Sequence, residues 1–179
     1  MSVSIGTSLP LHLEDLPQGD GGPRIELVDG GLLVTPMAGP GHQYTVGRLQ
    51  TCLSATAPAG WVVLPGANVA RRGAQDRLLI PDVLVVEASV LTENSPYIDP
   101  SDVLLVVEVE APSTKSTDRL LKRELYAQWR IPHYWLVAVD ERRITKLALT
   151  PERRYDEAVA EDSWVTSVDT TSVWPDRSA

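Results

Sequence analysis

The most apolar segment of the chain ends in two acidic residues. Residues 103–110 are VLLVVEVE, and near-continuous Val and Leu predicts a strand that is buried on both faces. Residues two apart in a strand point to the same face, so we expect Glu108 and Glu110 to lie side by side. A buried carboxylate is costly unless a partner compensates its charge. The pattern therefore raises the question of which cation binds there.

The chain before this segment predicts short strands on either side of one long helix. Residues 11–16 predict a short helix, and residues 18–23 predict a loop because they are rich in Gly. Residues 24–37 predict a β-hairpin, since Asp29-Gly30 is a strong tight-turn signal between two apolar stretches.

The long helix is expected from about His42 to Ala57, with one apolar face formed by Val46, Leu49 and Leu53. Residues 61–72 then predict a strand, a turn and a second strand. Residues 77–87 predict a single strand in which Pro81 marks an edge or an irregularity, because Pro lacks a ladder donor. Residues 88–101 predict a polar loop.

After the acidic segment, Ser116 or Thr117 can cap a helix that runs to about Arg130. Residues 133–140 predict a strand, so strand, helix and strand together indicate a βαβ crossover. Residues 142–149 predict a hairpin partner for that strand, and residues 163–174 either add a strand or pack on the core.

These elements predict an α/β (α+β) fold with a mixed β-sheet flanked by helices, in one domain over residues 1–179. We expect the ends, residues 1–10 and 175–179, to be flexible. The N-terminus lacks the features of a signal peptide, and no apolar run reaches membrane-spanning length. The single cysteine, Cys52, fits a reducing cytoplasm.

The acids suggest a cation site. Asp82 lies in the strand before the acidic segment, and Glu108 lies at the end of the next strand. If the two strands are neighbours, both carboxylates can bind one divalent cation such as Mg²⁺ or Mn²⁺. Taken alone, the Pro81-Asp82 pair is more often a simple turn, whereas Glu108 at the end of a buried strand needs a reason.

Other candidates are ambiguous by spacing alone. Asp118, Lys122 and Tyr126 share one face of the predicted helix, where Asp118 and Lys122 more often form a solvated ion pair. Placed near the carboxylates, Lys122 could orient a water or stabilise charge on a phosphate. Glu26 in the hairpin and His42 at a helix start are further candidates, although a lone histidine more often caps or packs.

The segments PDVLVVE and LLVVEVEAPSTKSTDRLLKRELYAQWRIPHYWLV resemble the Uma2 family of the PD-(D/E)XK nuclease superfamily, and IELVDGGLLVTPMAGPGH resembles that family's hairpin, Pro-rich turn and His. The resemblance covers roughly residues 11 to 150. It implies a restriction-endonuclease-like core and Mg²⁺-dependent hydrolysis of DNA phosphodiesters, in which the cation polarises the phosphate and activates a water.

The resemblance also implies roles for individual residues. Asp82 and Glu108 match the two acids of the superfamily motif, and Glu26 matches an acid that can add a metal ligand. The usual lysine two residues after the second acid is replaced by Glu110, and Lys122 takes its part from the helix. Tyr126 either bonds to the site or packs. Glu110 either adds charge to the site or pairs with Lys115 or Lys122.

Two alternatives stay open. The net charge of −8 and Glu110 mildly favour a non-catalytic binding or scaffold protein with the same fold. The low positive charge also suits a metal-dependent hydrolase of small phosphoesters. DNA is the expected partner, a membrane is not, and a homodimer would allow two strands to be cut. Basic residues that can line a nucleic-acid groove or form a solvated face are Arg71, Arg72, Arg77, Lys115, Arg119, Lys122 and Arg123.

Overall fold

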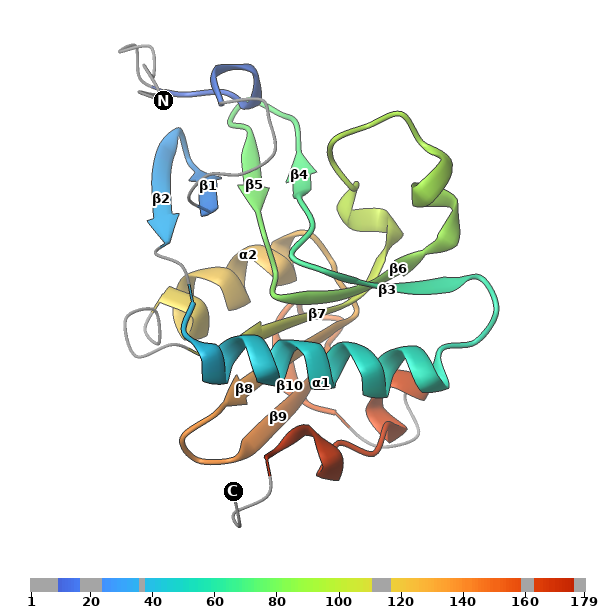
Figure 1. Ribbon diagram of the computed structural model, residues 1–179. Coiled ribbons are helices and arrows are strands. Elements are labelled where there is room, and N and C mark those ends of the chain that lie inside the picture. The colour runs from blue at the N-terminus through green and yellow to red at the C-terminus, as the bar shows by residue number, and fades with distance from the viewer. Residues whose placement is uncertain (1–9, 17–23, 36–37, 111–116, 159–162, 176–179) are drawn as a thin grey trace.

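The computed structural model describes residues 10–16, 24–35, 38–110, 117–158 and 163–175, with the backbone alone at 117–119. The described strands form two sheets (Figure 1). The smaller has the order β2-β1-β5-β4, from Gly31–Thr35, Arg24–Val28, Arg77–Leu79 and Val69–Arg71. The larger has the order β10-β9-β8-β7-β6-β3, from Tyr155–Glu157, Arg143–Leu149, His133–Ala138, Val103–Val109, Val83–Glu87 and Trp61–Pro65.

The predicted hairpin is confirmed as β1 and β2. Val28 pairs with Gly31, and the turn residues Asp29 and Gly30 have φ of 50° and 78°. Positive φ at both central residues is the geometry of a type I′ turn, which suits Asp-Gly. The small sheet packs on its own apolar cluster, which includes Leu27, Leu78 and Leu13 of the 3₁₀ helix Leu13–Asp15.

The large sheet is buried on both faces around β7. Strand β7 pairs in parallel with β8 and antiparallel with β6. Figure 1 shows α1 (Pro40–Thr56) across one face and α2 (Arg123–Gln128) on the other. Because side chains alternate along β7, Val107 packs on the α1 side and Val106 on the α2 side. The predicted βαβ crossover is thus confirmed.

Helix α1 confirms its predicted face and begins slightly earlier than expected. Val46, Leu49 and Leu53 are buried against the sheet. Pro40 occupies the first turn, where its missing N–H costs nothing and its fixed φ suits a helix. On the same side of the sheet, Val165, Val168 and Val173 pack into the core from short 3₁₀ turns.

The prediction of one strand over residues 77–87 is wrong. The structure has two strands there, β5 in the small sheet and β6 in the large one. The chain passes from sheet to sheet at Ile80–Asp82, where Pro81 cannot donate to a ladder. The strands predicted over 61–72 are likewise divided between the sheets as β3 and β4.

Smaller differences concern the connections. The segment predicted as a polar loop contains the 3₁₀ helices Ala88–Thr92 and Pro100–Asp102. Strand β10 is not predicted by the sequence pattern, since Tyr155 is its one buried residue. The crossover helix begins as a π-helix, Thr117–Lys122, before α2, and the Ser116 cap lies outside the described residues.

The expectations for residues 18–23 and for flexible ends also fall outside the described residues, apart from Pro10 and Pro175. Within the described part of the chain, no helix has both the length and the apolar content needed to cross a bilayer.

Candidate active site

Asp82 and Glu108 are neighbours across two strands, as the sequence predicts. Val83 pairs with Val107, so the residues just beyond that pair, Asp82 and Glu108, lie opposite each other. The amide of Asp82 donates to the carbonyl of Val107 at 3.0 Å. Both side chains are buried, with 5% and 2% of their surface exposed. Two buried carboxylates in such positions need compensating groups.

Lys122 bridges Glu108 and Glu26. Its Nζ lies 3.1 Å from Oε1 of Glu108 and 3.0 Å from Oε1 of Glu26. Tyr126, one turn along the helix, donates its hydroxyl to Oε1 of Glu108 at 2.6 Å. The amide of Ile80 donates to Oε1 of Glu26 at 2.7 Å. Lys122 and Tyr126 of the crossover helix thus fix the side chain of Glu108 on the α2 side of the sheet.

Glu26 retains one unused oxygen. Its Oε2 is buried and has no hydrogen-bond partner in the described structure. A buried carboxylate oxygen without a donor is a costly arrangement that a water or a cation would relieve. The position of this oxygen beside Lys122 and Glu108 therefore points to a further ligand in the cluster.

Asp82 is held by a different set of groups. Its Oδ1 accepts from Nη1 of Arg24 at 2.5 Å. Its Oδ2 accepts from the amide of Val109 at 2.8 Å and lies 3.2 Å from Nε2 of His42. Burial would raise the pKa of Asp82, but the hydrogen bond to His42 and the charge of Arg24 outweigh it and hold this pKa at about 2. Asp82 is therefore a carboxylate at neutral pH.

Tyr126 is held as a phenol. Burial, reinforced by the charges of Glu108 and Glu26, raises the pKa of Tyr126 well above its ordinary value. Its hydroxyl thus stays protonated and serves as a fixed donor to Glu108. Arg24 and Lys122 are thus the basic side chains that contact the acids Asp82, Glu108 and Glu26.

The donor chemistry of the cluster fits a hard divalent cation. Asp82 and Glu108 supply carboxylate oxygens from adjacent strands, and Glu26 supplies the unused Oε2. Mg²⁺ needs one or two protein carboxylates and fills its other positions with water and phosphate. Among the described residues, no three His, Cys, Asp or Glu side chains converge on one point in this conformation. The fit therefore rests on the Asp82–Glu108 pair.

The comparisons with known proteins show the family of the chain and the likeness of its fold. A family model, Uma2, described as "Putative restriction endonuclease", matches residues 11–174. The chain belongs to the Uma2 family. Its fold is also similar to a solved structure described as a "putative nuclease belonging to DUF820" from Anabaena variabilis. That match has a TM-score of 0.61 and 16% identity, and it covers 82% of this chain and 83% of the other. Among curated proteins, none matches.

The structure of this Uma2 protein brings together most of the predicted site residues, namely Glu26, Asp82, Glu108, Lys122, Tyr126 and His42. Glu110 follows β7, is buried, and its amide donates to Val137. The side chains of Asp118 and Lys115 lie outside the described residues.

The sequence analysis missed Arg24. The signal was present, because Arg24 and Glu26 are two apart in a strand and therefore share a face. What the spacing does not reveal is that Asp82, 58 positions away, would lie within reach of its guanidinium.

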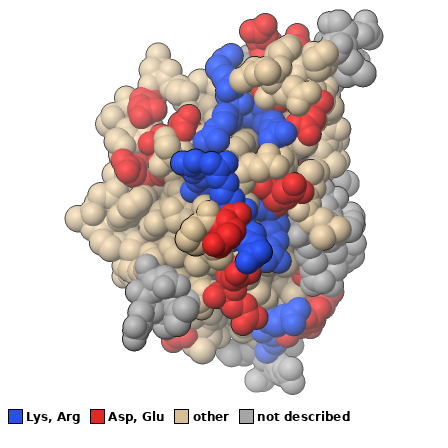
Figure 2. All heavy atoms as spheres, turned by 180° about the vertical axis from the view of Figure 1, so that it is seen from behind, with Lys and Arg blue, Asp and Glu red and all other residues tan. Residues whose placement is uncertain are grey.

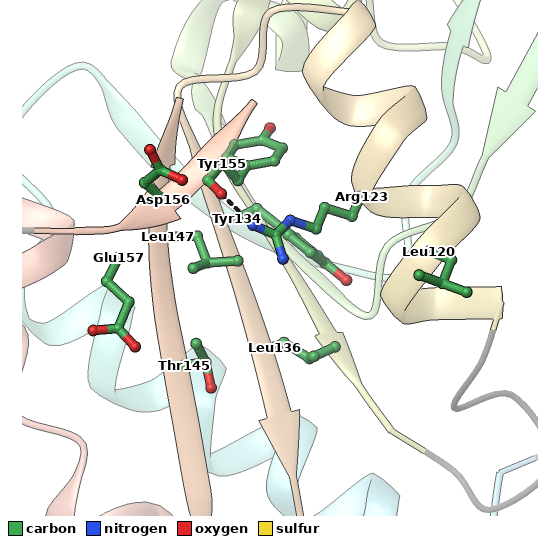
Figure 3. Close-up of a pocket in the computed structure, with 9 residues that line it drawn as sticks. All are labelled: Leu120, Arg123, Tyr134, Leu136, Thr145, Leu147, Tyr155, Asp156 and Glu157. Carbon is green, nitrogen blue, oxygen red and sulfur yellow. Dashed lines mark hydrogen bonds between the residues drawn. The ribbon is translucent and has the colours of Figure 1, made fainter. Parts of the chain in front are cut away.

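A hollow in the Uma2 protein lies between α2 and strands β8 to β10. Its volume is about 490 Å³, and Figure 3 shows Leu120 and Arg123 facing Asp156 and Glu157 across an apolar floor. Arg123 donates to the carbonyl of Tyr155, which ties the helix to β10. None of Glu26, Asp82 and Glu108 lines this hollow, so we assign the hollow no part in the chemistry.

Proposed function

We propose that this Uma2 protein is a metal-dependent nuclease that hydrolyses DNA phosphodiester bonds. Asp82 and Glu108 hold Mg²⁺ or Mn²⁺, with Glu26 as a further ligand. One observation carries the proposal: Glu108 lies opposite Asp82 on the neighbouring strand, and Nζ of Lys122 lies 3.1 Å from Oε1 of Glu108. Family membership and the nuclease-like fold support it.

The chain's own residues have separate tasks in this proposal. Lys122, paired with the buried side chains of Glu26 and Glu108, can hold a water or offset charge that develops on a phosphate. Tyr126 and the amide of Val109 fix one oxygen each of Glu108 and Asp82. When bound, the cation supplies Lewis acidity at the scissile phosphate.

A basic surface supports a nucleic-acid substrate despite the acidic chain. Arg71 and Arg77 pair directly across β4 and β5, and the charge of Arg77 is already compensated by Asp29, whose Oδ1 lies 2.6 Å from Nη2 of Arg77. Arg71 donates to the carbonyl of Trp129, the residue before Arg130, and Arg77 donates to the side chain of Gln128. Arg72 follows Arg71 in the chain and is exposed, as is Arg130. We call Arg71, Arg72, Arg77 and Arg130 the arginine cluster. Figure 2 shows that, on the face seen from behind, Lys and Arg side chains gather in a band along the middle with Asp and Glu side chains beside them.

Glu108→Gln tests the proposal. It removes the charge of a proposed ligand while keeping its shape, and Glu87→Gln at the exposed end of β6 is the matched control. Mn²⁺ binding by calorimetry should be lost only in Glu108→Gln. Nicking of supercoiled DNA should fall by about 100-fold or more in the same variant. Unchanged metal binding and nicking in Glu108→Gln would contradict the proposal.

A non-catalytic binding protein is the second candidate. One observation favours it, namely that Asp82 and Glu108 form ion pairs with Arg24 and Lys122. Such a protein would bind DNA, yet neither the wild type nor any variant would nick it in Mg²⁺ or Mn²⁺. Dimerisation stays a prediction under either function.

A further inference from the structure

Arg24 lies on the solvent side of the site formed by Glu26, Asp82 and Glu108. Its side chain is 26% exposed, whereas that of Asp82 is 5% exposed. Arg24 is the first residue of β1, and its side chain reaches Asp82 from the small sheet. A ligand that approaches the cluster from solvent would therefore meet the Arg24 side chain before the buried carboxylates.

Only part of the Arg24 guanidinium is used. Nη1 donates to Asp82, but Nε and Nη2 are buried and have no partner in the described structure. A guanidinium has five N–H donors, and buried donors without acceptors are costly. Three unused N–H groups on one fork match two oxygens of a phosphate.

The contacts of Asp82 show what Arg24 blocks. Oδ2 is fixed by the amide of Val109 and by His42, whereas Oδ1 has Arg24 as its one partner in the described structure. A cation that binds Asp82 through Oδ1 would meet a positive charge 2.5 Å from that oxygen. Arg24 and a divalent cation therefore compete for one oxygen.

We propose that Arg24 is a positioning residue that exchanges partners. Without a cation it neutralises Asp82. With a cation on Asp82, its guanidinium turns to a DNA phosphate next to the scissile bond. The inference rests on the proposed function, since it assumes a cation at Asp82. It adds a phosphate-binding group to the site and a reason why the metal-free cluster is stable.

A purely structural ion pair makes a different prediction. If Arg24 served only to anchor β1 to Asp82 in the segment before β6, its removal would distort Asp82 and weaken metal and DNA binding together. Partner exchange requires opposite signs, because removal of Arg24 frees Oδ1 for the cation but takes away a contact to phosphate. Two binding measurements on one variant therefore separate the two roles.

The test compares wild type, Arg24→Gln and Arg24→Lys, with Arg143→Gln as the control for an exposed arginine that also pairs with one carboxylate, Glu141. Calorimetry with Mn²⁺ should give at least about fivefold tighter binding for Arg24→Gln. Binding of a short DNA duplex is measured by fluorescence anisotropy in Ca²⁺, which takes the same oxygen ligands. Arg24→Gln should bind the duplex about tenfold more weakly than wild type. Arg24→Lys should show both signs at smaller size, and Arg143→Gln neither.

If wild type binds Mn²⁺ and Arg24→Gln binds it equally or more weakly, the exchange is overturned and the proposed function stays in place. Absence of Mn²⁺ binding in both proteins would overturn the proposed function and this inference with it. Thermal unfolding confirms that the variants fold. If Arg24→Gln does not fold, the signs in Arg24→Lys decide.

Discussion

Asp76 is the residue that ties the N-terminal segment to the small sheet. Its carboxylate accepts from the amides of Leu13 and Gly73 and lies 3.5 Å from Nδ1 of His12. Burial would raise the pKa of Asp76, but these backbone hydrogen bonds and His12 outweigh it, so the pKa is lowered. This ionised group therefore contributes stability above the unfolded-state pKa of about 4, and the contribution is lost as pH falls through the folded value.

We expect Asp76→Asn to lower the free energy of unfolding by about 1–2 kcal/mol at neutral pH, because an amide is a weaker acceptor than a carboxylate. The difference from wild type should be smaller at an acidic pH below about 4 than at neutral pH, because the contribution of the charge is lost as pH falls through the folded-state pKa. Urea unfolding at both pH values measures it, with the exposed Asp156→Asn as control. An equal difference at both pH values would show that the charge of Asp76 is irrelevant.

At the scale of elements, the β1–β2 turn was predictable because it depends on two adjacent residues. Gly30 also contacts Pro10, and its carbonyl accepts from Leu11. Its φ is 78°, and a Cβ added there would lie 2.3 Å from Cβ of Pro10. Gly31, the next residue, has ordinary space around it.

Gly30→Ala should therefore destabilise the protein by about 2 kcal/mol, through left-handed backbone strain and the clash with Pro10. Gly31→Ala should change the free energy of unfolding by less than about 0.5 kcal/mol. The urea midpoints of the two variants provide the comparison. Equal midpoints would mean that the hairpin and the Pro10 segment rearrange freely.

The 77–87 segment shows where prediction from the pattern failed. Its apolar residues suit either one long strand or two short ones, and both satisfy the same alternation. The division into β5 and β6 depends on which strands lie alongside, Leu27 of β1 for Leu78 and Val107 of β7 for Val83. Those partners are distant in sequence, so a local pattern does not reveal them.

At the scale of the molecule, a net charge of −8 coexists with the arginine cluster. Arg72 and Arg130 are exposed, so they can be changed with little effect on folding. If they bind phosphates, the double variant Arg72→Gln/Arg130→Gln should reduce the slope of log affinity against log salt by about 2. Anisotropy titrations at several salt concentrations measure this slope.

Arg142→Gln/Arg143→Gln, at the β8–β9 turn, removes the same charge elsewhere and should leave the slope almost unchanged. A slope that falls equally in both double variants would mean that total charge, and not this surface, controls binding.

By itself, the sequence determined the elements whose signals are local. The type I′ hairpin, the apolar face of α1, the doubly buried β7 and the βαβ crossover all follow from turn residues and hydrophobic period. Glu108 was identified as a candidate because an acid at the end of a buried strand needs a partner, and Asp82 because it matches the first acid of the nuclease motif. Their predicted catalytic roles await the experiments above.

Only the tertiary structure decided how the two sheets meet. Where the sheets meet, Arg24 of the small sheet contacts Asp82 before β6, and Glu26 of the small sheet contacts Lys122 of the crossover helix. The tertiary structure also decided that His42, at the start of α1, reaches Asp82. These contacts join residues that are 40 to 96 positions apart, since Lys122 and Glu26 differ by 122 − 26 = 96. Long-range strand register and side-chain reach control them, and neither is encoded in a local pattern.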